Sequence, residues 1–142
     1  MRVQDLMTKG VYTIAPDVTA IAALSEMRRH QVHHLVVMEA RDIVGVISER
    51  DLGGRRRGAD AGRTAGELMT PKPVTAPPDM TVRRAANLMR GRSLGSLPVV
   101  RDGKLVGILT ISDLLDAIGR GDLGRSEHVL SSFQGRRFVA NR

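Results

Sequence analysis

Residues 5–52, DLMTKGVYTIAPDVTAIAALSEMRRHQVHHLVVMEARDIVGVISERDL, recur as residues 67–114, ELMTPKPVTAPPDMTVRRAANLMRGRSLGSLPVVRDGKLVGILTISDL. The two stretches align without a gap, and 16 of the 48 paired residues are identical. Most of the other apolar positions stay apolar. An internal repeat of this quality decides the architecture before the propensities of single residues are considered. We therefore expect two copies of one structural unit, with any ligand site present once in each copy.

The length of the chain supports this division. A chain of 142 residues accommodates one compact domain or two halves that share a core. Each half is marginal for an independent core, so the halves are expected to pack on each other. The predicted boundaries are a first repeat at 1–54, a Gly/Arg-rich linker at 55–63, a second repeat at 64–118 and a basic tail at 119–142.

Each copy predicts a short helical segment followed by the order β-α-β-β-α, which is an α+β (mixed α/β) fold. Thr19 and Thr81 are suitable N-caps because apolar residues at helical spacing follow them. Asp102-Gly103 indicates a hairpin, and Pro98 cannot donate to a strand ladder, so it should face an open edge or a cleft. The expected strands are 11–14, 74–75, 35–38, 97–100, 43–47 and 105–109; the expected helices run from 20 to about 30, from 82 to about 92, and onward from 48–52 and 110–114.

The formal net charge of +7 lies mostly outside the repeats. Residues 1–52 carry 6 basic and 7 acidic side chains, and residues 64–118 carry 7 and 5. A nucleic-acid-binding protein usually presents a basic face on a folded element, and base stacking needs aromatic side chains, which are scarce here. Nucleic-acid binding through Arg55–Arg57 and the tail is therefore the alternative function and not the first one.

Several classes of function are disfavoured by what the sequence lacks. It has no Cys, no Gly-x-Ser-x-Gly elbow and no phosphate-binding Gly-Lys-Ser/Thr loop, so an enzyme is not expected. His30, His33 and His34 straddle a helix end and a strand start and are not repeated, so no metal site and no required cofactor are expected. The absence of an apolar leader or membrane-length stretch predicts a cytoplasmic protein without membrane contact.

The repeated motifs resemble tandem cystathionine-β-synthase (CBS) domains, the arrangement called a Bateman module. Each copy opens with Leu-Met-Thr and ends its last strand in Gly-φ-φ-Ser/Thr-x-x-Asp, where φ is apolar, at 45–51 and 107–113; Leu-Pro-Val-Val at 97–100 is also typical. The resemblance implies two repeats packed sheet to sheet about a pseudo-two-fold axis. It further implies two clefts for AMP, ADP, ATP or S-adenosylmethionine, a homodimer, and regulation of an unidentified partner protein.

The same resemblance selects the candidate ligand-binding residues. Asp51 and Asp113 match the carboxylate that accepts from ribose hydroxyls, and Ser48 and Thr110 could donate to phosphate at a helix start. The alternative is structural, because Ser/Thr-x-x-Asp also matches a helix capping box. Arg50 could neutralise a phosphate or simply be solvated. The full candidate set is Thr8, Val11, His33, His34, Ser48, Arg50, Asp51, Thr70, Pro73, Gly95, Ser96, Pro98, Thr110, Ser112 and Asp113.

The two copies differ at several of these positions. His33, His34 and Arg50 in the first copy correspond to Gly95, Ser96 and Ser112 in the second. The two clefts should therefore differ chemically, and one could bind a ligand that the other does not.

Overall fold

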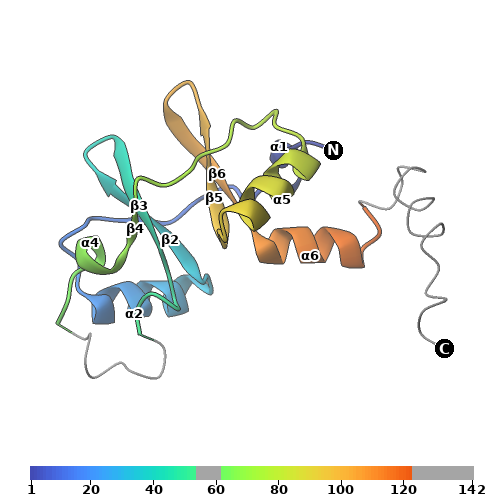
Figure 1. The fold of residues 1–142 in the computed structure, drawn as a ribbon. Coiled ribbons are helices and arrows are strands. Elements are labelled where there is room, and N and C mark those ends of the chain that lie inside the picture. The colour runs from blue at the N-terminus through green and yellow to red at the C-terminus, as the bar shows by residue number, and fades with distance from the viewer. Residues whose placement is uncertain (54–61, 123–142) are drawn as a thin grey trace.

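The computed structural model describes residues 1–53 and 62–122 of the chain. Arg55–Arg57 and nearly all of the predicted tail lie outside these residues. The described part is a mixed α/β fold of two similar halves (Figure 1). The first half contains α1 (Val3–Leu6), β1 (Thr13–Ile14), α2 (Ala20–His30), β2 (His34–Glu39) and β3 (Asp42–Ser48). The second contains α4 (Ala65–Leu68), β4 (Thr70–Pro71), α5 (Val82–Gly91), β5 (Ser96–Arg101), β6 (Lys104–Thr110) and α6 (Ile111–Gly119).

The principal helices and hairpins form where the sequence predicts them. Thr19 Oγ1 accepts a hydrogen bond from the N–H of Ala22, and Thr81 Oγ1 accepts from Arg84. These bonds satisfy backbone donors that the first helical turn leaves free. Asp102 and Gly103 both have positive φ, as a two-residue hairpin turn requires. The antiparallel pairs β2–β3 and β5–β6 have equivalent registers, including an irregularity at the same place.

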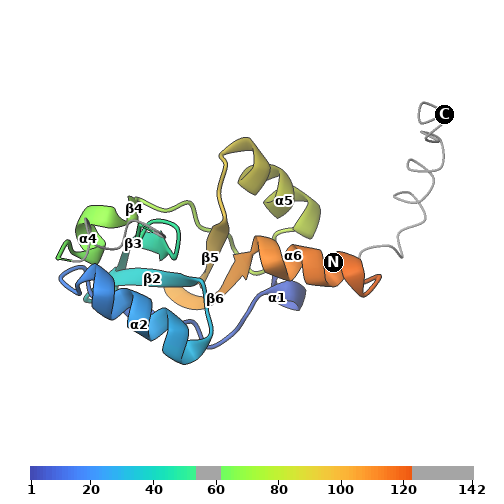
Figure 2. The same ribbon diagram turned by 90° about the horizontal axis from the view of Figure 1, so that it is seen from below.

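The opening segments, Val3–Thr8 and Ala65–Thr70, do not pack with their own repeats. Strand β4 pairs with β3 of the first repeat, completing the sheet order β1-β2-β3-β4. In the same manner, Thr8 exchanges two backbone hydrogen bonds with Ile108 of β6. Helix α1 lies beside α6 at the second repeat, as Figure 2 shows, and α4 lies beside α2 at the first repeat (Figures 1 and 2). Each opening segment therefore crosses to the other repeat.

The same exchange divides the hydrophobic core into two clusters. Ala65, Leu68 and Met69 pack with the buried residues of the first repeat, which include Met27 and Leu35. Val3, Leu6 and Met7 pack with those of the second, which include Met89 and Leu97. Because each cluster needs residues from both repeats, neither repeat contains a complete core of its own.

Two glycines make this crossing possible. A Cβ on Gly45 would collide with the Met69 side chain, and a Cβ on Gly107 would collide with that of Met7. The carbonyl oxygens of Thr70 and Thr8 would lie only 3.0 and 3.1 Å from these Cβ positions. Glycine is thus required where the crossing backbone approaches strands β3 and β6.

Two predicted elements are wrong, each for a local reason. Residues 74–75 do not form a strand, and only Ala76 makes a bridge, to Val99. In the first repeat the N–H of Val36 donates to Tyr12, but its counterpart Pro98 has no N–H to donate. The expected helix at 48–52 is replaced by successive turns with hydrogen bonds between residues three apart. Gly53, the last described residue before the gap, has φ of 89°.

Candidate ligand-binding clefts

Two cavities lie between the repeats, and each is lined by both. The first cleft, of about 480 Å³, lies between the turn after β3 and the chain that follows β4. Its lining comprises His33, His34, Val46, Ser48, Glu49, Arg50, Asp51, Thr70, Lys72, Pro73, Val74, Ser93, Leu94, Gly95, Ser96, Ile111 and Ser112. The second cleft, of about 380 Å³, is lined by Thr8, Lys9, Gly10, Val11, Tyr12, His30, Gln31, Val32, His33, His34, Ile108, Thr110 and Ser112.

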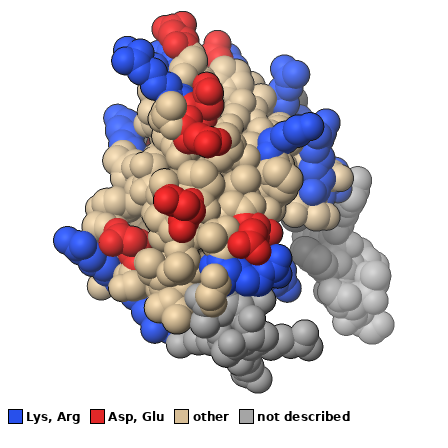
Figure 3. All heavy atoms as spheres, turned by 90° about the vertical axis from the view of Figure 1, so that its left-hand side faces the viewer, with Lys and Arg blue, Asp and Glu red and all other residues tan. Residues whose placement is uncertain are grey.

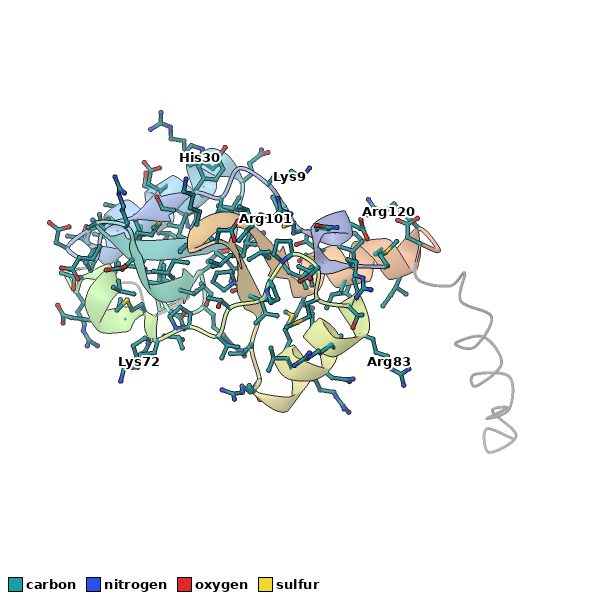
Figure 4. The ribbon with its side chains drawn as sticks, turned by 90° about the horizontal axis from the view of Figure 1, so that it is seen from above. Lys9, His30, Lys72, Arg83, Arg101 and Arg120 are labelled. Atoms are coloured by element: carbon teal, nitrogen blue, oxygen red, sulfur yellow. The ribbon has the colours of Figure 1, made fainter. Side chains whose placement is uncertain are left out.

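The crossing of the opening segments decides which candidate residues meet. The Ser48–Asp51 end of the first repeat faces Thr70 and Pro73 of the second. Thr110 of the second repeat faces Thr8 and Val11 of the first. In Figure 4, Lys9 and His30 of the second cleft lie on one side of the molecule, and Lys72 of the first cleft lies on the other.

Two of the fifteen candidates line neither cleft. Pro98 is fully buried, and its carbonyl accepts from the N–H of Ala76. The expectation that it faces an open edge or a cleft is therefore corrected, because the segment around Ala76 covers it. Asp113 lies next to the second cleft but is held by Thr8 and Thr110. The structure brings the other thirteen to the walls of the two clefts.

Asp51 and Asp113 both make the hydrogen bonds of a capping box, which was the alternative to ligand binding. Asp51 Oδ2 accepts from the N–H of Ser48 at 2.9 Å, and Ser48 Oγ accepts from the N–H of Asp51 at 3.2 Å. Asp113 Oδ2 and Thr110 Oγ1 make the same reciprocal bonds at 2.9 and 3.2 Å. These are capping-box contacts, which orient both carboxylates and leave one oxygen of each for another partner.

That remaining oxygen distinguishes the two clefts. Thr8 Oγ1 donates to Asp113 Oδ1 at 3.1 Å. Among the described residues, nothing donates a hydrogen bond to Asp51 Oδ1, although Thr70 lines the same cleft. A carboxylate oxygen accepts readily from hydroxyl and N–H groups. Asp51 therefore has an acceptor available to a ligand, whereas the equivalent acceptor of Asp113 is already used.

His34 lies where the two clefts meet. Together with His33 and Ser112 it lines both cavities, and its Nε2 is 3.3 Å from the position of a Cβ on Gly95. Burial lowers the pKa of His34, and the neighbouring His33 lowers it further, while Asp51 and Asp113 oppose both effects. Burial thus favours the neutral imidazole over the protonated one at this position.

The other two His residues have local partners. His33 Nδ1 is 2.8 Å from Glu49 Oε2, and His30 Nε2 is 3.1 Å from Glu26 Oε2. The His30 ring also stacks on Tyr12, with ring centroids 3.7 Å apart. No group of three or more His, Cys, Asp or Glu side chains suitable for a metal is found within residues 1–53 and 62–122.

The candidate set does not include several lining residues, among them Lys72, Lys9 and Tyr12. Lys72 adopts φ of 49°, and its counterpart Gly10 adopts φ of 70°. Residues after each opening segment thus turn sharply into the cleft of the other repeat. The basic residues one or two positions after each Leu-Met-Thr were the available signal, but their destination depends on the crossing.

Comparison with known proteins identifies the family. The CBS domain model matches residues 3–53 and 65–120. The chain belongs to the CBS domain family. The CBS domain-containing protein YhcV of Bacillus subtilis is 33% identical over 114 residues, covering 79% of this chain and 81% of that protein. Inosine-5′-monophosphate dehydrogenase of Korarchaeum cryptofilum is 29% identical, but the match covers 80% of this chain and only 23% of the enzyme.

Solved CBS structures share the fold of this chain. The CBS domain pair of protein MJ0100, in complex with 5′-methylthioadenosine and S-adenosyl-L-methionine, has a TM-score of 0.76 and 27% identity, covering 84% of this chain and 97% of the other. The structure of CBSX2 in complex with AMP has a TM-score of 0.69 and 30% identity, covering 84% and 96%. Across the described residues, no helix has the length and apolar character needed to cross a membrane.

Proposed function

We propose that this CBS domain pair is a regulatory sensor that binds an adenosine-containing ligand, with the first cleft as the primary site. The observation that carries the proposal is the available oxygen of Asp51, fixed by the Ser48 cap and exposed to a cavity of about 480 Å³. A ribose diol presents two hydroxyl donors to such an acceptor. The complexes of related CBS pairs with AMP and with S-adenosylmethionine support this class of ligand.

The charges around the first cleft suit the rest of such a ligand. Arg50 and Lys72 are exposed at its wall and have no ion-pair partner among the described residues. They provide two positive charges for a phosphate or another anionic group. Apolar surface from Val46, Val74 and Leu94 is available for a base. AMP, ADP, ATP and S-adenosylmethionine are therefore the ligands to test.

The experiment is calorimetric titration with each of these four compounds, paired with thermal unfolding. A ligand that binds only the folded state raises the melting temperature. At a ligand concentration one hundred times Kd, the free energy of unfolding increases by about 2.7 kcal/mol. Asp51→Asn should abolish the tighter binding event, whereas Asp42→Asn, at the exposed start of β3, should leave it unchanged. Unchanged melting with all four compounds at millimolar concentration contradicts the proposal.

The sensor is proposed to act as a cytoplasmic homodimer that controls a partner protein. An exposed apolar stripe on α6 supports the dimer: Ile111, Leu115 and Ile118 are 49%, 62% and 61% exposed. These residues recur at helical spacing on one side of the helix. Leu115→Asp should convert a dimer to a monomer in sedimentation analysis, and a wild-type protein that is monomeric at all concentrations contradicts this part of the proposal.

A further inference from the structure

The exposed face of α5 is entirely polar and carries only positive charge. Val82, Ala85 and Met89 form its buried side. The opposite side presents Arg83, Arg84, Asn87, Arg90 and Gly91, all exposed, which we call the α5 arginine face. Arg83 points away from the body of the protein in Figure 4. None of these residues lines either cleft, so this surface is separate from the proposed ligand sites.

The positive charge of this face is not neutralised locally. The sequence contains no Asp or Glu between Met80 and Arg101. In the part of the chain that the structure describes, the side chains of Arg83, Arg84 and Arg90 make no hydrogen bond or ion pair. Three guanidinium groups within eight residues of one helix therefore repel one another without a compensating carboxylate. Such an arrangement costs stability in the isolated protein, and an anionic partner would remove this cost.

The first repeat provides an internal comparison. The matching positions on α2 are Ile21, Ala22, Ser25, Arg28 and Arg29, so only two of the five are basic. On that helix, Glu26 lies 3.7 Å from Arg29 and 3.1 Å from His30. Figure 3 views the left-hand end of Figure 1, where α2 and α4 lie, and shows acidic and basic side chains interspersed. The arginine face is thus a property of the second repeat and not of the shared fold.

We propose that the α5 arginine face binds the phosphate backbone of a nucleic-acid duplex without reading its sequence. Arg is the side chain best suited to bidentate phosphate contacts. The face lacks the apolar or aromatic anchors that dominate protein–protein interfaces, while protein–nucleic acid interfaces are polar and strongly positive. It also lacks an aromatic side chain on which unpaired bases could stack. Nucleic-acid-binding proteins usually present their basic residues on one face of a folded element. The α5 arginine face is such a surface.

The test is duplex DNA of arbitrary sequence titrated with the full chain across a series of salt concentrations. Each phosphate contact contributes about −0.9 to the slope of log Kobs against log salt concentration. In the variant carrying Arg83→Gln, Arg84→Gln and Arg90→Gln, three contacts are removed, so the negative slope should become shallower by about 2.7. The matched control is Arg28→Gln with Arg29→Gln on α2, which should keep the wild-type slope. A melting temperature of the triple variant equal to or above that of the wild-type protein verifies that folding is intact, because the substitutions remove the mutual repulsion.

Three results overturn the proposal. The first is an unchanged slope and affinity in the triple α5 variant, which would assign any binding to basic residues elsewhere. The second is competition by polyglutamate as strong as that by duplex DNA, which would indicate a carboxylate-bearing protein partner instead. The third concerns the sequence of the duplex. A different sequence of the same duplex length should bind equally, and a strong sequence preference would contradict backbone recognition. None of these outcomes depends on whether AMP binds in the clefts.

Discussion

The clearest contrast in this molecule is between two aspartates in the same local structure. Asp51 and Asp113 each close a capping box with equal distances, yet only Asp113 also accepts from a threonine of the other repeat. The difference does not come from the motif itself, because Thr8 and Thr70 are the same residue type in matching positions. Nor does it come from the docking register, because Thr8 pairs with Ile108 as Thr70 pairs with Val46. It lies in the hydroxyl contact to the aspartate that Thr8 makes and Thr70 does not. Two sites of common origin have therefore become unequal through contacts made by their partner repeat.

The largest expected effect tests whether the two cores are energetically equivalent. Leu35 and Leu97 occupy matching positions in β2 and β5, and both are fully buried. Replacing either by Ala should lower the free energy of unfolding by about 2–5 kcal/mol, through lost burial and the cavity created. Urea denaturation followed by circular dichroism measures both values. Each variant should still unfold in one transition, and two separate transitions would show that the repeats are independent units.

The next effect concerns the crossing of the opening segments. Gly45→Ala and Gly107→Ala should each cost about 1–3 kcal/mol, because the new methyl group overlaps a methionine and approaches a backbone carbonyl. Gly91→Ala is the control, since a Cβ there meets nothing within 4 Å. The same denaturation measurement applies. If Gly45→Ala and Gly107→Ala were both neutral, the close approach of the two backbones would be ruled out.

A smaller difference is expected between the two caps. Thr110 caps the nine-residue helix α6, whereas Ser48 closes only a series of turns. Thr110→Ala should therefore cost about 1 kcal/mol, and Ser48→Ala should cost less. Thermal unfolding of both variants in the absence of ligand provides the comparison. A larger cost for Ser48→Ala would show that the first cap stabilises more structure than the turn it closes.

The smallest effect is the pH dependence contributed by His34. Burial lowers the pKa of His34 below its usual value of 6.5, so the unfolded chain binds a proton more readily than the folded protein does. Stability should accordingly decline as the pH falls below 6.5, until the folded-state pKa is reached. His34→Gln should reduce this decline, and His33→Gln should reduce it less, because it removes only the smaller of the two effects that lower the pKa of His34. Nuclear magnetic resonance titration of the ring protons checks the direction directly, and a pKa above 6.5 would contradict it.

The sequence predicts the local structure well wherever the determinants are local. Thr19 and Thr81 lie directly before their helices, and Asp102-Gly103 forms the expected turn. The predictions from sequence fail where the local structure depends on a contact between segments that are distant in the sequence. The missing strand near Val74 depends on the absent N–H of Pro98, and the composition of each cleft depends on the crossing that carries Lys72 to the first repeat. Nothing within Leu-Met-Thr specifies which of two similar sheets will receive it.

The crossing also bears on the origin of the chain. A single repeat has an opening segment but no second sheet on which to place it, unless another copy of itself supplies one. A one-repeat ancestor would therefore have built its clefts by exchanging segments between two identical subunits, giving two identical sites. Fusion of the two copies into one chain removed that symmetry requirement. Thereafter mutations could change one site alone, as with His34, whose counterpart is Ser96.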